Sequence, residues 1–487
     1  MTREPDHNQT LIAAENGPVI EADDTGLVLR LSDRVIRDIA RRIGLPAAPE
    51  AAPEAAPVQP ASATVQWLDA ALLGDIDAWD LQREGEWLRF LAHRPGPQGA
   101  RRYRRHASGG GIIAETPGPV LGLLSLGAGR RMTTFGGTPD FPHHVMACHV
   151  PDEGEPDHPV HGWRNRGADT MLADALLALR HRAHRALPLI VALPVLLPPG
   201  PLPTADHPSV AAAEDQLRRL TRLASALDKP ARLLAVGVEF GHDQAPADAA
   251  QFHAEALGWL DLIAARIAPG ELGRPRFLMV ADGGPWWAHD PARNRAAIEG
   301  QHRLFLRPGL HDVTPVAPSY MFAQDDLGQP TPEAMAERAM IEAAALETLL
   351  RRQPWICPLM CLAEREDRTV RAVFKAAGPL VIDPADPFGA GPAAGFALAG
   401  TTAGIAGIEI APDDPQSVLI HLDGPLEPEG GTEPRLDYAV GGPPRGRGAA
   451  NPPACGALRD DWSLDHGGHV LRRWALPGSL VIRGSPC

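Results

Sequence analysis

Polar side chains that could carry out chemistry follow three short apolar runs of this chain. The segments after these runs supply, in order, Glu239, His242 and Asp243; Asp282, Trp286 and Trp287; and, beyond Tyr320, Asp325 and Asp326. A serine nucleophile needs a neighbouring base that an acid holds in line, and aromatic rings are common in ligand-binding surfaces. In α/β folds the functional loops leave the carboxyl ends of the strands, so these segments form the predicted site.

The apolar runs are the predicted strands that position these groups. They read PLIVALPVLL (188–197), RLLAVGVEF (232–240), RFLMVADGG (276–284) and DVTPVAPSYMF (312–322). The second and third are continuous and rich in Val and Leu, which is typical of parallel strands buried on both faces. Helical spacing of apolar residues predicts helices over 67–76, 168–186, 211–228, 247–267 and 332–352. This alternation predicts a doubly wound, parallel α/β domain over residues 64–352.

The pattern changes near residue 353, where the helical spacing ends. Short alternating runs follow, separated by Gly, Pro and Asp-Asp clusters: TVRAVFKA, PLVID, GFALAG, IAGIEIA, SVLIHLDG, RLDYAVGG and a final SLVIRG. Several short strands with such punctuation predict an all-β sandwich, or jelly roll, over residues 353–487.

The N-terminal part of the chain is a small segment of its own. Within residues 1–44, positions 27–31 alternate like a strand, and positions 33–44 repeat apolar residues at helical spacing. Residues 45–63 repeat Ala, Pro and Glu, which predicts an extended, semi-rigid linker. Residues 1–44 either dock onto a partner while the rest projects away, or the linker is a plain spacer, and both interpretations stay open.

Composition limits the class of partner. The net charge of −14 repels phosphate backbones, so we expect no nucleic-acid partner, and the basic run 101–105 is predicted to be a solvated loop. No apolar stretch reaches the roughly 18 residues needed to span a bilayer, so we expect no membrane partner. The first residues, MTREPDHNQT, lack the pattern of a secretory signal.

Metal and cofactor motifs are not evident in the sequence. The five cysteines, among them Cys357 and Cys361, are scattered and do not complete a zinc site, which favours reduced, structural thiols. The histidines of FPHHVMACHV lack the spacing of an HExxH helix, so we interpret them as packing or surface residues. GAGP at 389–392 is a turn and not a phosphate loop. We therefore expect neither a metal nor a cofactor.

The order of these blocks resembles the SGNH hydrolases, and more narrowly the sialate-O-acetylesterase-like and phage-associated members that carry a β-sandwich after the catalytic domain. The resemblance covers roughly residues 118–440. Its blocks are PVLGLLSLGAGRRMTTFGG (119–137), GVEFGHDQA (237–245) and SYMFAQDDLGQPTPEAMAERAMIEA (319–343), and CGALRDD (455–461) looks like the closing loop of the sandwich. The resemblance implies a serine in a Gly-Gln-Ser-like motif after the first strand, and a base with its orienting acid in a late Asp-x-x-His.

The sequence departs from that pattern at both motifs. Leu123-Leu124-Ser125 stands where Gly-Gln-Ser is expected, and the third residues after Asp325 and Asp326 are Gly and Gln instead of His. A serine without a base keeps its proton and attacks poorly. We therefore expect a catalytically degenerate, SGNH-like protein.

Three hypotheses on function remain. In the first, the chain is a spike or fibre component of a phage or phage-derived particle such as a gene transfer agent; it is assembled in the cytoplasm, docks other particle proteins through residues 1–44, and contacts cell-surface polysaccharide, with Trp286, Trp287 and Tyr320 as candidate binding residues. Such components are commonly symmetric oligomers, so a homo-oligomer is compatible with it, although no heptad repeat specifies one.

In the other two hypotheses the chain is not a catalytically degenerate protein that binds a glycan. The second is an active carbohydrate O-acetylesterase with Ser125 as nucleophile, His242 or His311 as base, Asp243 or Asp326 as orienting acid, and backbone amides near Gly127 as the oxyanion hole. The third is a purely structural adaptor within the particle.

Overall fold

The computed structural model describes residues 9–14, 17–23, 26–29, 76–93, 99–127, 129–136, 139–147, 167–197, 202–240, 246, 248–283, 291–324, 330–441 and 454–484. The chain divides into two compact units, residues 1–69 and 70–487. In the first unit three antiparallel strands form one sheet in the order β1-β2-β3: Gln9–Ala14, Gly17–Asp23 and Gly26–Leu29. The third overlaps the strand predicted at 27–31, whereas the helix predicted at 33–44 and the linker at 45–63 lie outside the described residues.

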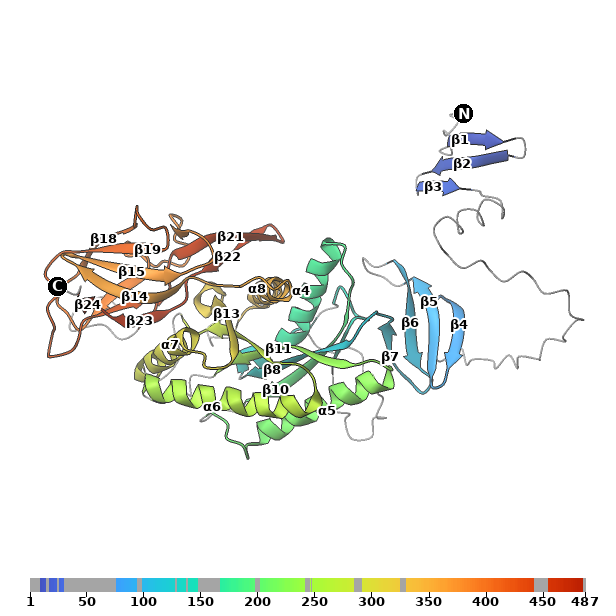
Figure 1. Ribbon diagram of the computed structural model, residues 1–487, viewed down its shortest axis with the longest axis horizontal. Helices are drawn as coiled ribbons and strands as arrows, with labels where there is room; N and C mark the ends of the chain where they lie inside the picture. The colour runs from blue at the N-terminus through green and yellow to red at the C-terminus, as the bar shows by residue number, and fades with distance from the viewer. Residues whose placement is uncertain are drawn as a thin grey trace, which may run out of the picture. The chain divides into compact units, whose positions relative to one another are not determined.

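A six-stranded, all-parallel sheet forms the centre of the second unit (Figure 1). Its order is β13-β12-β11-β8-β10-β9, and its strands are β8 (Val120–Gly127), β9 (Val145–Ala147), β10 (Leu189–Leu196), β11 (Ala231–Glu239), β12 (Arg276–Ala281) and β13 (Asp312–Pro318). The predicted parallel α/β sheet is confirmed, and its four predicted strands are β10 to β13.

Helices cover both faces of this sheet. They are α4 (Ala168–Arg182), α5 (Pro208–Ala226), α6 (Ala249–Ile267), α7 (Pro291–Leu306) and α8 (Pro332–Leu350). Alternate residues of β8 serve the two faces, because Leu124 packs in one core with α5, α6 and α7, and Leu123 packs in another with α4 and α8. Four of these helices were predicted from the sequence, and α7 was not.

The strand order reverses at β8. The chain places β10 on one side of β8 and then crosses back to place β11 on the other, after which β12 and β13 follow outward. In open α/β sheets, ligands bind outside the carboxyl ends of the strands at such a switch point. The topology therefore directs attention to the carboxyl ends of β8 and β11.

An antiparallel sheet that the sequence analysis did not predict precedes β8. Its strands run in chain order: β4 (Ala78–Glu84), β5 (Trp87–His93), β6 (Ala100–His106) and β7 (Gly109–Ala114). The prediction of a solvated loop at 101–105 is wrong, because these residues lie within β6. Tyr103 is buried against Phe90, while the Nη2 of Arg104 donates to Glu115 at 3.1 Å. Arginine occupies four of the five positions 101–105, which hides the apolar alternation of a strand.

The C-terminal region is all-β, as predicted. Its three sheets have the orders β18-β19-β15-β14-β24, β16-β21-β22 and β17-β20-β23. The strands are β14 (Leu359–Glu366), β15 (Thr369–Lys375), β16 (Leu380–Ile382), β17 (Phe396–Ala399), β18 (Ile405–Ile410), β19 (Ser417–Leu422), β20 (Arg435–Tyr438), β21 (Leu458–His466), β22 (His469–Trp474), β23 (Gly478–Val481) and β24 (Arg483–Gly484). Residues 458–461, expected in a closing loop, instead begin β21.

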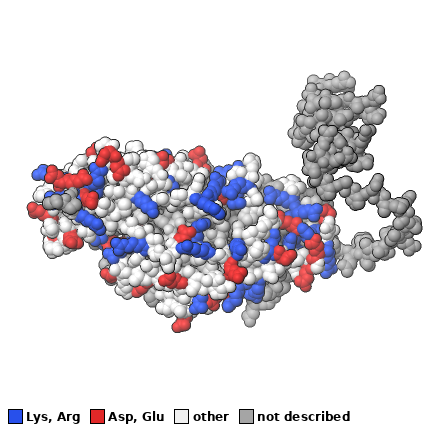
Figure 2. All heavy atoms as spheres, in the orientation of Figure 1, with Lys and Arg blue, Asp and Glu red and all other residues white. Residues whose placement is uncertain are grey.

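Charged side chains of both signs are interspersed on the face that Figure 2 shows. Mixed charge of this kind is ordinary for a protein surface. Among the residues that the structure describes, no helix has the length and apolar character needed to cross a membrane.

Polar contacts join helix α7 to the C-terminal strands. The Nη1 and Nη2 of Arg295 donate to the two carboxylate oxygens of Asp437 at 2.9 and 2.8 Å. The Nε2 of His302 donates to the carbonyl of Met360 at 2.8 Å, and the ring lies so close to Gly478 that a Cβ there would approach it to 2.6 Å. Burial lowers the pKa of His302 to about 4, although its bond to Met360 opposes the shift.

The low pKa of His302 predicts acid sensitivity at this junction. Because the folded-state pKa lies below the usual 6.5, the contribution of neutral His302 to stability is complete above pH 6.5 and is lost as the pH falls toward 4. The loss reaches about 3 kcal/mol, at about 1.4 kcal/mol per pKa unit. We expect His302→Gln, measured by urea unfolding between pH 7 and 4, to reduce the pH dependence by this amount.

The exposed His469, on β22, supplies the matched control. His469→Gln should leave the pH dependence as in the wild type. Equal slopes for His302→Gln and the wild type would contradict the assignment.

Candidate site at the switch point of the parallel sheet

Ser125 lies inside strand β8, near the switch point. It pairs with Gly237 of β11 on one side and with Pro194 of β10 on the other. Its exposed fraction is 2%, so the hydroxyl is closed off from solvent. The resemblance implied a serine in a loop, whereas the structure places this serine in the sheet itself.

Arg131 occupies the space next to Ser125. It belongs to the short helix α3 (Gly129–Met132), directly after β8, and its exposed fraction is also 2%. Its Nε donates to the Oγ of Ser125 at 3.2 Å. Its Nη1 and Nη2 donate to Oε1 and Oε2 of Glu342, on α8, at 3.0 and 3.4 Å. The guanidinium thus joins β8 to the helix across the sheet edge in a bidentate pair.

Two glycines make room for this arginine. A Cβ on Gly127 would lie 2.7 Å from the Cβ of Arg131, and a Cβ on Gly237 would overlap its Nη2. Gly127 is the last residue of β8, and Gly237 lies two residues before the end of β11, so the absence of side chains at both positions leaves the space that the arginine occupies. The close approach of the Arg131 side chain, and not a turn, is the reason for glycine at these two positions.

A second ion pair extends the arrangement. Arg338, one turn before Glu342 on α8, donates from its Nε to Oε1 of Glu342 at 3.1 Å and pairs through Nη2 with Oε2 of Glu239 at 2.7 Å. Glu239 is the last residue of β11. We call Arg131, Glu239, Arg338 and Glu342 the buried ionic cluster. Its two positive and two negative groups balance, and each is 5% exposed or less.

The charges of the cluster hold each other in the ionised state. Burial works to raise the pKa of Glu342, but attraction to Arg131 and Arg338 outweighs it, and the pKa is lowered. Burial likewise works to lower the pKa of Arg338, and its two glutamates raise it instead. Nearby, burial raises the pKa of Asp169 above its usual range. Asp169 accepts a hydrogen bond from the backbone amide of Thr170 at 2.9 Å.

This arrangement does not activate Ser125. Arginine stays protonated and can only donate, so Arg131 cannot accept the serine proton. Within the described residues, no histidine forms a hydrogen bond with Ser125. A nucleophile needs such an acceptor held in line. The described part of the site therefore contains paired ionised side chains and no activated serine.

One proposed base is placed far from the serine. His311 precedes the first residue of β13, at the amino edge of the sheet, and its Nε2 lies 2.9 Å from a carboxylate oxygen of Asp261 on α6. Strand β13 is three strands from β8, which is about 14 Å at normal strand spacing. The hypothesis that His311 acts as base for Ser125 is wrong.

The other predicted site residues divide into two groups. Tyr320 is buried, and its hydroxyl donates to the carbonyl of Ala475 at 2.7 Å, so it packs the α/β sheet region against the C-terminal strands. Its role in substrate binding stays a prediction. The remaining candidates lie outside the described residues: His242, Asp243, Trp286, Trp287 and Asp326.

The structure gives His143 and His144 backbone partners, the carbonyls of Ile112 and Pro188 at 3.3 and 3.2 Å. Among the described ranges, no group of three or more His, Cys, Asp or Glu side chains has an arrangement that could hold a metal ion.

Sequence reasoning missed Arg131, Arg338 and Glu342. One signal was present: Arg338 and Glu342 lie four residues apart in a helix whose other residues are mostly Ala, Met, Ile and Leu. Charges on such an apolar helix need a buried partner. The partner itself is 211 residues away from Glu342 in the chain, at Arg131. The spacing of residues within a helix could not have identified this partner.

Comparison with known proteins gives only distant similarity. No protein-family model matches the sequence, and no curated protein matches it. The structure is similar to that of a carbohydrate acetylesterase from Xanthomonas citri, with a TM-score of 0.46 and 12% identity, over 82% of this chain and 86% of that chain. It is also similar to a protein from Arabidopsis thaliana, with a TM-score of 0.35 and 13% identity, over 48% of this chain and 99% of that chain.

The buried ionic cluster predicts strong coupling between its members. Arg131→Met leaves Glu342 and Glu239 to share one guanidinium, and we expect a loss of about 3–5 kcal/mol in the free energy of unfolding. Glu342→Met should cost a similar amount. The double variant keeps the Arg338–Glu239 pair, so it should be clearly less destabilised than the sum of the two single variants. Urea unfolding followed by circular dichroism measures all three.

A matched control replaces Arg303, an exposed arginine of α7. Arg303→Met should change stability by no more than about 0.5 kcal/mol. Additive losses in the double variant would show that Arg131 and Glu342 do not act as a pair.

Proposed function

We propose that the chain is a non-catalytic, SGNH-like component of a phage or phage-derived particle, such as a gene transfer agent, that contacts cell-surface polysaccharide. The observation that supports the loss of catalysis is the hydrogen bond from Arg131 to the buried Ser125. An arginine that is itself fixed by Glu342 fills the place beside the serine where a base would have to stand.

The remaining parts of the proposal come from the sequence. Residues 1–44 dock another particle protein, and the Pro/Ala-rich linker at 45–63 holds the bulk of the chain away from it. Residues 64–352 form the SGNH-like α/β domain and 353–487 the β-sandwich. Trp286 and Trp287 are the aromatic residues proposed to contact the glycan.

An esterase assay tests the catalytic part of the proposal. We expect the full chain to hydrolyse p-nitrophenyl acetate and an acetylated polysaccharide no faster than Ser125→Ala, while a true esterase run in parallel is active. The reason is that a serine hydroxyl without a base remains protonated. Circular dichroism of each variant checks that the fold is retained.

The buried Ser319, whose hydroxyl donates to the carbonyl of Gly283 at 2.7 Å, supplies a matched control. If the wild type releases acetate well above background, Ser125→Ala does not, and Ser319→Ala does, then the chain is an esterase and the base must be sought outside the described residues, at His242 first. If no variant is active, binding of the full chain to capsulated against capsule-free cells tests the glycan contact. Equal binding to both would leave the structural adaptor as the function.

A further inference from the structure

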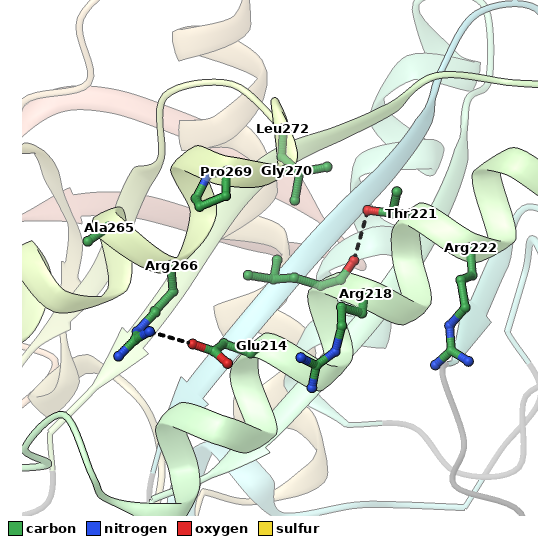
Figure 3. Close-up of a pocket in the computed structure, with 10 residues that line it drawn as sticks. Glu214, Arg218, Thr221, Arg222, Ala265, Arg266, Pro269, Gly270 and Leu272 are labelled. Atoms are coloured by element: carbon green, nitrogen blue, oxygen red, sulfur yellow. Dashed lines mark hydrogen bonds and ion pairs between the residues drawn. The ribbon is translucent and has the colours of Figure 1, made fainter.

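A pocket of about 510 Å³ lies between helix α5 and the end of α6, where the short helix η2 (Ala268–Gly270) follows (Figure 3). The segment after η2 leads into the amino end of β12, so the pocket lies at the edge of the sheet opposite the carboxyl ends of the strands. Its volume is within the range of about 300–1,000 Å³ that small-ligand sites occupy. The pocket is thus separate from the buried ionic cluster.

The spacing of charged residues on α5 brings them to one face. Glu214, Arg218 and Arg222 are four residues apart, so they follow one another on successive turns. Figure 3 shows Arg218 and Arg222 projecting toward the same side of the pocket, with Arg266 of α6 turned toward Glu214. Two like charges at this spacing repel each other in a bare helix, and a bound anion would relieve the repulsion.

The guanidinium groups of the pocket are unequally paired. Arg266 lies 2.9 Å from Glu214, whereas Arg218 reaches Asp215 only at 3.8 Å. Within the described residues Arg222 has no hydrogen bond and no ion pair. Three guanidinium groups and one carboxylate therefore line the pocket. A positive site of this kind contrasts with a chain whose net charge is −14.

The pocket also has apolar walls. Leu217 and Leu272 line it, and both side chains belong to the core beneath α5 and α6. A rigid apolar floor with a few charged groups at the rim is the usual composition of a ligand site. A sugar ring with an acidic substituent has the matching chemistry, because its ring carries apolar C–H faces and its anion accepts two donors from a guanidinium.

We propose that this pocket binds an acidic sugar unit of a polysaccharide. Arg218 and Arg222 hold the anionic group, and the ring rests on Leu217 and Leu272. The inference rests on the proposed contact with polysaccharide and adds to it the class of glycan and the place of binding. The anion is a carboxylate, as in a uronic acid, or a sulfate, and the two share the chemistry that the guanidinium groups recognise.

Titration calorimetry of the full chain tests this pocket. The probes are an oligogalacturonate, a sulfated oligosaccharide of equal length and a neutral maltooligosaccharide. We expect at least one acidic probe to bind, more weakly at high salt, and the neutral probe not to bind. The double variant Arg218→Gln with Arg222→Gln should weaken binding about a hundredfold, on the order of tenfold for each charge-assisted hydrogen bond.

Helix α7 and the residues after it offer a matched control. Arg303 and Arg307 are also exposed and four residues apart, so Arg303→Gln with Arg307→Gln makes the same change in net charge away from the pocket. This control should bind within twofold of the wild type. The acidic probe that binds better identifies the anion, and either result supports the inference.

Other outcomes overturn the inference in distinguishable ways. Equal loss of binding in both double variants would mean that acidic glycans bind through the general charge of the surface and not in the pocket. Undiminished binding by the pocket variant would place the acidic glycan elsewhere. Binding of the neutral probe alone would overturn the pocket and leave the proposed polysaccharide contact standing. No binding of any glycan, to the chain or to capsulated cells, would overturn both.

Discussion

The carboxylate of Glu342 bridges two guanidinium groups, and the arrangement of the α/β region depends on this bridge. Through Arg131 it holds the segment after β8, and through Arg338 it is linked to Glu239 at the end of β11. Charges so deeply buried cost several kcal/mol each unless they are fully paired. The helix α8, the two central strands and the turn at α3 must therefore be in place together for any one of these ion pairs to form.

The same constraint bears on chemistry at the switch point. Gly127 and Gly237 create a space over the strand ends, and in this chain the side chain of Arg131 fills it. A hydrolase would need that space for a substrate carbonyl and for a base beside Ser125. The arginine fills this space and completes the ion pair with Glu342 at the same time. Removing the arginine alone would leave Glu342 buried with less compensation of its charge.

Strands and helices with regular apolar spacing could be predicted from the sequence. Side chains whose partners lie far away in the chain could not. Buried parallel strands such as 232–240 were recognisable because both of their faces need apolar residues. Helix α7 was missed because Arg295 and His302, which face the C-terminal strands, interrupt its apolar spacing. Arg131 was missed for a related reason: its partner on α8 is 211 residues away, and only the folded sheet brings the two together. Polar groups that join distant elements have no period in the sequence.

On helix α7, polar side chains of this kind connect the α/β region to the C-terminal strands. One face of the helix places Ala297 and Leu304 in the core under the parallel sheet. Its other contacts are made by Arg295 with the buried Asp437 and by His302 with the backbone of Met360. Separating the C-terminal strands from α7 would break these hydrogen bonds, each of which contributes on the order of 1 kcal/mol, and this opposes separation. The β-region is therefore held as part of one compact unit, and a ligand in the pocket between α5 and α6 would be carried on the same body.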